Sequence, residues 1–302
     1  MSSHRPAAEL LTIDGLVRNR ASSNESSDNR AFQLVTLAAI VGWLYCPVLL
    51  QLARQWWTDP NFSHGFFVPM FSCFLVWRQR SRLREIASPP SPWGLLIILL
   101  AMSALVVGIM GADIFLPRIS FLLLLAGMVI FFRGWFLFLA LLFPWAFLFL
   151  MVPIPALLLD QITFPLQILA SKLAAVLLRL CGVPVLREGN VINLPFIGLE
   201  VAEACSGIRS LFSLVTLALI YGHVIGARRH TLVVLAIAAV PIAVAANGLR
   251  IVGTGLLAQY WEPSKAEGFF HSFSGWLIFL VSFAFLVLIR RVMRVIAREP
   301  AR

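Results

Sequence analysis

The chain has 302 residues, of which 60% are hydrophobic and only 13% are charged. This balance excludes an ordinary soluble domain, which carries about 25% charged residues. The net charge of +10 comes mainly from arginines clustered beside apolar runs, a pattern typical of membrane orientation signals rather than of nucleic-acid binding.

The first 30 residues are polar and mixed in charge, and they lack the basic-then-apolar order of a cleavable signal peptide. We therefore predict a flexible cytoplasmic tail over 1–30, a transmembrane domain over 31–290 and a basic cytoplasmic tail over 291–302. The fold class is an all-α polytopic membrane protein. A membrane-spanning helix needs about 20 apolar residues, and about eight stretches qualify: 31–53, 62–77, 93–111, 116–132, 135–153, 207–222, 231–257 and 271–290.

The arginines give the orientation of these spans, because short basic loops tend to stay in the cytoplasm. With the N-terminus inside, each loop predicted to be cytoplasmic is basic, and the eight spans return the C-terminus to the same side. We predict a multi-pass protein of the cell inner membrane, with both termini cytoplasmic. The arginines concerned are Arg78, Arg80, Arg82, Arg84, Arg133, Arg228, Arg229, Arg290, Arg291, Arg294, Arg298 and Arg302.

The extracytoplasmic stretch 154–206 is too long to be only a connection. Its first part alternates polar and apolar residues at helical spacing, which predicts an amphipathic helix on the outer interface. Glycines and prolines then break the helix, and 191–194 predicts a short extended segment. Tryptophans near the helix ends are expected to face lipid as interfacial anchors: Trp43, Trp56, Trp57, Trp93 and Trp135.

Four cysteines occur without the spacing of a metal site, and the chain has no HExxH motif. We predict no metal, no cofactor and no disulfide framework. Cys46 and Cys73 lie within predicted spans and are expected to be packing residues.

Cys205 lies at the outer start of the span 207–222. Backbone N–H groups and the positive end of the helix dipole favour an anion there and lower the pKa of a thiol. This position predicts a nucleophilic thiolate. Two alternatives stay open: Cys205 is a small packing residue, or it forms a disulfide with Cys181, which is also extracytoplasmic.

Arg250 and His271 lie at the outer ends of the next two spans. An arginine inside a span is costly unless it has a partner, and Asn247, one turn earlier, is placed to brace the guanidinium. His271 has the titration range of a general base or acid. The alternative for Arg250 is that its side chain only extends to the outer membrane–water interface. The alternative for His271 is a residue at that interface without a role in catalysis.

The helix count places Cys205, Arg250 and His271 at one depth. A nucleophile, a proton shuttle and a fixed cation are the parts of a cysteine acyl transferase.

Other polar residues are supporting candidates for this site. Arg209 lies one turn from Cys205 and is an alternative to Arg250 as the cation, or it only positions Glu203. Glu203 is expected either to orient Arg209 or His271 or to cap the start of the helix. His64 is expected either to contact the substrate or the other site residues or to pack in an outer loop.

The segment Glu203-Ala204-Cys205-Ser206-Gly207-Ile208-Arg209, the pair Asn247-x-x-Arg250 and His271 resemble the three signature motifs of the exosortase/archaeosortase family. Further similar segments begin at Asn61, Phe143 and Gly182, so the resemblance runs from about residue 35 to 290. It implies a sortase-like cysteine protease/transpeptidase with Cys205 as nucleophile, Arg250 as oxyanion or thiolate stabiliser and His271 as base and acid.

The resemblance also implies the substrates. These are exported proteins with a C-terminal Pro-Glu-Pro-type motif (PEP-CTERM), a transmembrane helix and a basic cluster, cut on the extracytoplasmic face and passed to an acceptor. Membrane lipid is an expected partner, and nucleic acid is not. The competing hypotheses are a transporter, which would place ionisable groups near the midplane on broken helices, and a non-catalytic assembly factor for polysaccharide or surface-protein export.

Overall fold

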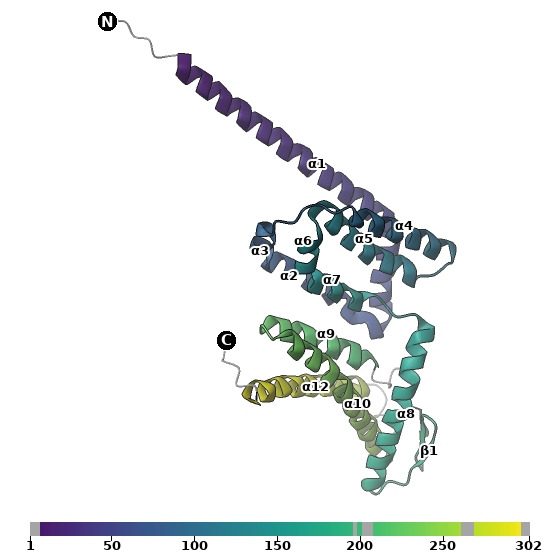
Figure 1. Cartoon of the computed structure of the whole chain (residues 1–302). Coiled ribbons are helices and arrows are strands. Elements are labelled where there is room, and N and C mark those ends of the chain that lie inside the picture. Colours follow the sequence, from purple (N-terminus) through teal and green to yellow (C-terminus); the bar gives the residue numbers. More distant parts are fainter. Residues whose placement is uncertain (1–6, 196–197, 201–207, 261–268, 297–302) are drawn as a thin grey trace. The chain divides into compact units, whose positions relative to one another are not determined.

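The computed structural model describes the backbone of residues 7–195, 198–200, 208–260 and 269–296, with side chains except at 7–31, 34, 200, 258 and 269–274. In these ranges nearly all of the chain is helical (Figure 1). It divides into two compact units, Met1–Gln51 and Leu52–Arg302. This architecture confirms the predicted all-α fold class.

The first unit consists of most of helix α1, Ala7–Thr58. The part Val35–Thr58 is apolar enough to cross a membrane, in agreement with the predicted span 31–53. Helix α1 begins well before that span, so the predicted tail is helical from Ala7 onward. Its alanines, glutamates and arginines are good helix formers that continue the helix. Its placement in the cytoplasm stays a prediction.

The second unit begins with short helices and a tight hairpin. The 3-10 helix η1 spans Pro60–Phe66. The helices that follow are α2, Phe67–Arg78, α3, Arg80–Glu85, α4, Trp93–Met110, and α5, Phe115–Arg133. Glycines let α4 and α5 approach closely, because a Cβ at Gly94 would overlap the Phe131 backbone and one at Gly108 would lie 2.5 Å from the Pro117 ring. Close contacts at small residues are typical of helix pairs in membranes.

The predicted span 135–153 is not one helix. It consists of α6, α7 and the 3-10 helix η2, Trp135–Ala140, Leu142–Phe147 and Leu148–Met151. The carbonyl group of Pro144 accepts a hydrogen bond from the Ser72 hydroxyl of α2 at 2.9 Å, which ties α7 to α2.

Helix α8, Ala156–Leu180, leads to a small antiparallel sheet of β1, Leu186–Glu188, β2, Val191–Asn193, and β3, Gly198–Glu200. Strand β2 confirms the extended segment predicted over 191–194. The Ser171 hydroxyl donates to the Gly189 carbonyl at 3.1 Å, so the β1–β2 turn is held against α8.

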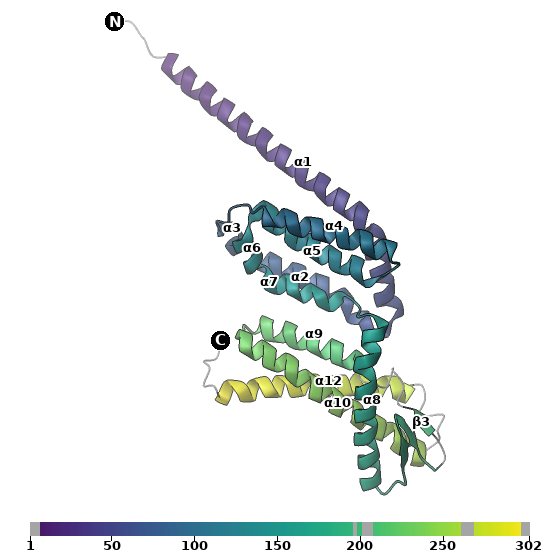
Figure 2. The same cartoon turned by 45° about the vertical axis from the view of Figure 1, so that its right-hand side comes forward.

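The last three helices are α9, Ile208–Val224, α10, Arg229–Tyr260, and α12, Phe269–Ile296. They share one core of small and branched side chains: Leu214, Ala218, Leu235, Ala239, Ala243 and Leu286. Figures 1 and 2 both show α8 running across the direction of α9 and α12. This direction fits the predicted interfacial helix, although α8 is also long and apolar enough to cross a membrane.

Six helices of the described ranges are candidate spans: Val35–Thr58, Trp93–Met110, Phe115–Arg133, Ala156–Leu180, Arg229–Leu257 and Gly275–Ile296. Five of them match predicted spans, and the chain is therefore a polytopic membrane protein. The other predicted spans, 62–77, 135–153 and 207–222, are shorter or broken helices. The count of eight stays a prediction.

Candidate functional site

Helix α10, which carries Arg250, packs closely against α8 at the level of Gly248. Asn247 is buried, with 4% of its surface exposed, and a Cβ at Gly248 would lie 2.7 Å from a methyl group of Leu173. The absence of a side chain at Gly248 therefore lets α8 approach α10 at this level. The Arg250 carbonyl accepts a hydrogen bond from the Thr254 hydroxyl at 3.0 Å, within the same helix.

The Arg250 guanidinium reaches α12. A Cβ built on Gly275 would lie 3.7 Å from Nη1 of Arg250, which is an ordinary van der Waals distance. Gly275 follows His271 by four residues, and residues four apart share one face of a helix. The structure thus brings Arg250 to the first turns of α12, where His271 lies. The side chain of His271 is outside the described residues.

Cys205 and Glu203 also lie outside the described residues, immediately before α9. Ile208, the first residue of α9, is 1% exposed and belongs to a buried cluster with Leu52, Trp56 and Phe62. This burial fixes the start of α9, which is the end nearest Cys205. Arg209 is exposed.

Helices α9, α10 and α12 pack against one another. Since the three follow one another in an up-down-up order (Figure 2), the start of α9, the end of α10 and the start of α12 lie at one end of the layer. Of the predicted catalytic residues, Arg250 and the backbone of His271 belong to the described helices α10 and α12, whereas Cys205 precedes α9 in the sequence and is outside the described residues.

His64 of η1 packs beside the start of α9. Its ring is 7% exposed and lies 5.9 Å from the Phe212 ring, centroid to centroid, in a stacked arrangement. Its Nε2 lies 3.1 Å from the Leu150 carbonyl, so Nε2 carries the proton in the neutral ring.

His64 lies outside the six candidate spans. Burial lowers its pKa from the usual value, and hydrogen bonds to the backbone of Leu150 and Asn61 offset the effect only in part. The ring is therefore neutral at neutral pH. A neutral, buried imidazole therefore lies next to the start of α9.

Two residues differ from their sequence interpretation. Trp56 does not face lipid: it is 8% exposed and its indole N–H donates to the Met151 carbonyl at 2.8 Å. Gly65 makes room for it, because a Cβ there would overlap the indole. Arg118, which is not among the site residues predicted from the sequence, is 3% exposed on α5. A buried arginine in a span is a functional candidate by its cost alone.

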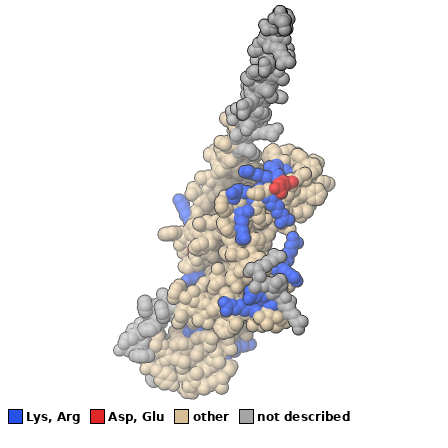
Figure 3. All heavy atoms as spheres, turned by 90° about the vertical axis from the view of Figure 1, so that its left-hand side faces the viewer, with Lys and Arg blue, Asp and Glu red and all other residues tan. Residues whose placement is uncertain are grey.

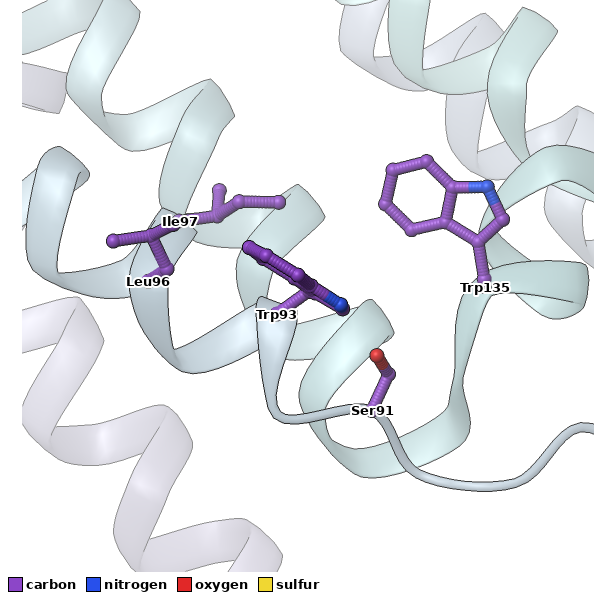
Figure 4. A pocket seen from close by; sticks show the side chains of 5 residues that line it. All are labelled: Ser91, Trp93, Leu96, Ile97 and Trp135. Atoms are coloured by element: carbon purple, nitrogen blue, oxygen red, sulfur yellow. The ribbon is translucent and has the colours of Figure 1, made fainter.

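One cavity of the described residues lies apart from these residues. It has a volume of about 480 Å³ and lies between the starts of α4 and α6, where the rings of Trp93 and Trp135 face a common space beside the Ser91 hydroxyl (Figure 4). Trp93 is 69% exposed and Trp135 46%, as expected for interfacial anchors. With one hydroxyl and no ionisable lining residue, this hollow has no proton donor or acceptor for hydrolysis.

The family model of the transmembrane exosortase (Exosortase_EpsH) matches residues 56–288, more than half of the chain. The matched range contains Cys205, Arg250, His271 and all four supporting candidates. No curated protein and no solved structure matches the chain. The chain therefore belongs to the transmembrane exosortase family.

Proposed function

We propose that this exosortase is a membrane-embedded cysteine protease/transpeptidase that cuts the C-terminal sorting signals of exported proteins. The observation that carries the proposal is the position of the Arg250 guanidinium beside Gly275, one turn after His271. A fixed cation next to a histidine-bearing helix start, with a cysteine before the neighbouring helix, supports acyl transfer through a thioester.

In this mechanism the Cys205 thiol gives its proton to His271, and the thiolate attacks the carbonyl carbon of the scissile peptide bond. The negative charge that develops on the carbonyl oxygen is stabilised by the planar Arg250 fork. When the C–N bond breaks, His271 returns the proton to the departing amine. An acceptor nucleophile or water then attacks the thioester, and the thiol is released.

Asn247, Arg209, Glu203 and His64 have supporting roles in this proposal. Asn247 is buried one turn before Arg250 on the same face of α10 and braces the guanidinium. Arg209 is the exposed second residue of α9 and pairs with Glu203. His64, buried beside the start of α9, contacts the substrate or the other site residues.

The proposed sidedness is an extracytoplasmic active site with both termini in the cytoplasm of the inner membrane. Lysine and arginine side chains gather, with few acidic ones, on the face that carries α3 and the far ends of α9 and α12 (Figure 3). That face is opposite to the end of the helix layer that holds the proposed site (Figure 1). The positive-inside tendency therefore supports the proposed orientation.

The proposed substrates carry a Pro-Glu-Pro-type motif, a transmembrane helix and a basic cluster at the C-terminus. In the proposed orientation, the motif of such a substrate lies at the outer surface and its basic cluster in the cytoplasm. The scissile bond and Cys205 are then at the same depth.

The experiment is to co-express the full chain with a reporter protein that carries such a C-terminal signal and to follow the reporter's mass. Wild type should remove the transmembrane tail, whereas Cys205→Ala should leave it attached. A thioester between Cys205 and the reporter should accumulate when the acceptor is missing, and hydroxylamine should release it. Cys46→Ala is the matched control and should process the reporter normally.

Processing at the wild-type rate by Cys205→Ala contradicts the protease. A Cys205→Ser variant that still supports surface-protein export would then favour the assembly factor, because such a protein needs no thiol. A transporter would require transport activity that depends on Arg250 but not on Cys205.

A further inference from the structure

A second cavity, of about 710 Å³, opens between α6–α7 on one side and α9–α10 on the other. Twelve of its thirteen lining residues are apolar, and the remaining one is Arg229, the first residue of α10. The cavity is within the usual size range of a small-molecule site. We call it the inner groove, and its lining includes Leu139, Phe143, Leu219, Leu232, Ala236 and Val240.

The inner groove extends along one stripe of α10. The helix lines it from Arg229 to Val240, a rise of about 17 Å at 1.5 Å per residue. This is about half of the roughly 30 Å hydrocarbon thickness of a bilayer. A substrate's transmembrane helix needs a surface as long as the whole hydrocarbon layer, whereas a lipid acyl chain occupies one leaflet. The length of the groove therefore favours an acyl chain.

The structure explains why the groove is open. The break between α6 and α7 at Leu141 interrupts the wall, and the small side chains of Ala140 and Ala236 leave space along it. The two walls are joined by the Phe143 ring of α7, which stacks on the His223 ring of α9 with centroids 4.5 Å apart and planes 11° apart.

The charge at the groove selects its ligand. Arg229 is exposed at one end of the groove, and its neighbours Arg228 and His230 are also exposed. A guanidinium binds phosphate through a planar pair of donors, and basic pockets between membrane helices bind anionic lipid head groups. The same charge would repel the basic cluster of a substrate's tail. We propose that the inner groove binds an anionic glycerophospholipid, with one acyl chain along α10 and the phosphate on Arg229.

The proposal is tested by native mass spectrometry of the full chain with phosphatidylglycerol or with phosphatidylcholine of identical acyl chains. Wild type should retain phosphatidylglycerol preferentially. Arg229→Gln should weaken this retention about fivefold, the effect of one basic residue near anionic lipid. Arg291→Gln is the matched control, because Arg291 is an exposed arginine of α12 outside the groove. Equal retention by these two variants overturns the assignment of the phosphate to Arg229.

The placement of the acyl chain along α10 is tested with a second pair of variants. Ala236→Trp fills the groove and should reduce retention of both lipids, whereas Val234→Trp, on a part of α10 that does not line the groove, should not. Unchanged lipid retention by Ala236→Trp overturns the acyl-chain assignment. Displacement of the lipid by a peptide of the reporter's transmembrane segment would instead make the groove a substrate site and contradict the proposal.

Discussion

Gly275 offers a direct test of how Arg250 is positioned. Because a Cβ there would lie 3.7 Å from Nη1 of Arg250, alanine makes only ordinary contact with the guanidinium. The terminal carbons of leucine lie about 2.5 Å beyond Cβ, which is the distance between the end atoms of two successive C–C bonds. To regain a contact distance of about 3.5–4 Å, the guanidinium must move on the order of 2 Å.

A displacement of about 1 Å in a catalytic group can reduce the rate on the order of a hundredfold. We therefore expect Gly275→Ala to cut the reporter nearly as fast as wild type and Gly275→Leu to be slower by about a hundredfold or more. The measurement is the initial rate of reporter cleavage in proteoliposomes, with equal amounts of folded enzyme. Thermal unfolding of each purified variant separates a local effect from loss of the fold.

The matched control is Gly253→Leu on α10, where a Cβ would meet nothing within 4 Å. This variant should keep the wild-type rate although it makes the same chemical change within one turn of Arg250. The reasoning is refuted if Gly275→Leu cuts at the wild-type rate while Arg250→Ala is inactive, because the guanidinium would then act from a position that α12 does not limit.

Three further predictions concern the cation, the topology and the packing of the hairpin. Arg250→Lys keeps the charge but loses the planar fork, so cleavage should fall about a hundredfold, as for the loss of one oxyanion donor; an active Lys variant would show that charge alone suffices. A membrane-impermeant thiol reagent applied to spheroplasts should label Cys181 but not Cys73, and labelling of Cys73 alone contradicts the topology. Gly94→Val should lower the free energy of unfolding by about 2–3 kcal/mol through overpacking, measured by unfolding in detergent, whereas an unchanged stability would exclude the close α4–α5 contact.

Continuous apolar runs allowed the long helices to be predicted closely. The predicted spans 93–111 and 116–132 correspond to Trp93–Met110 and Phe115–Arg133, because a bilayer requires a run of that length. The interruption of 135–153 was not predicted, although Pro144 has no N–H to donate to the carbonyl of Ala140, where α6 ends.

For the site, the sequence predicted which helix ends share a depth but not which side chains meet. The approach of Arg250 to Gly275 depends on the rotation of α10 and α12 about their axes, which no local pattern specifies. Trp56 was misassigned for a similar reason. Its burial requires both the Met151 carbonyl and the space at Gly65, and a tryptophan at a helix end is usually an anchor.

The close α4–α5 hairpin also has a consequence for membrane assembly. Its contacts join residues that are near one another in the chain, with a connection of only a few residues between Met110 and Phe115. Pairs with such local contacts form quickly, and helices that have entered the bilayer associate there through close packing. This hairpin can therefore form as soon as α5 has been inserted, while α9, α10 and α12 are still to be synthesised. It provides an early folded surface for α9, because Leu122 of α5 and Ile208 of α9 belong to one buried cluster.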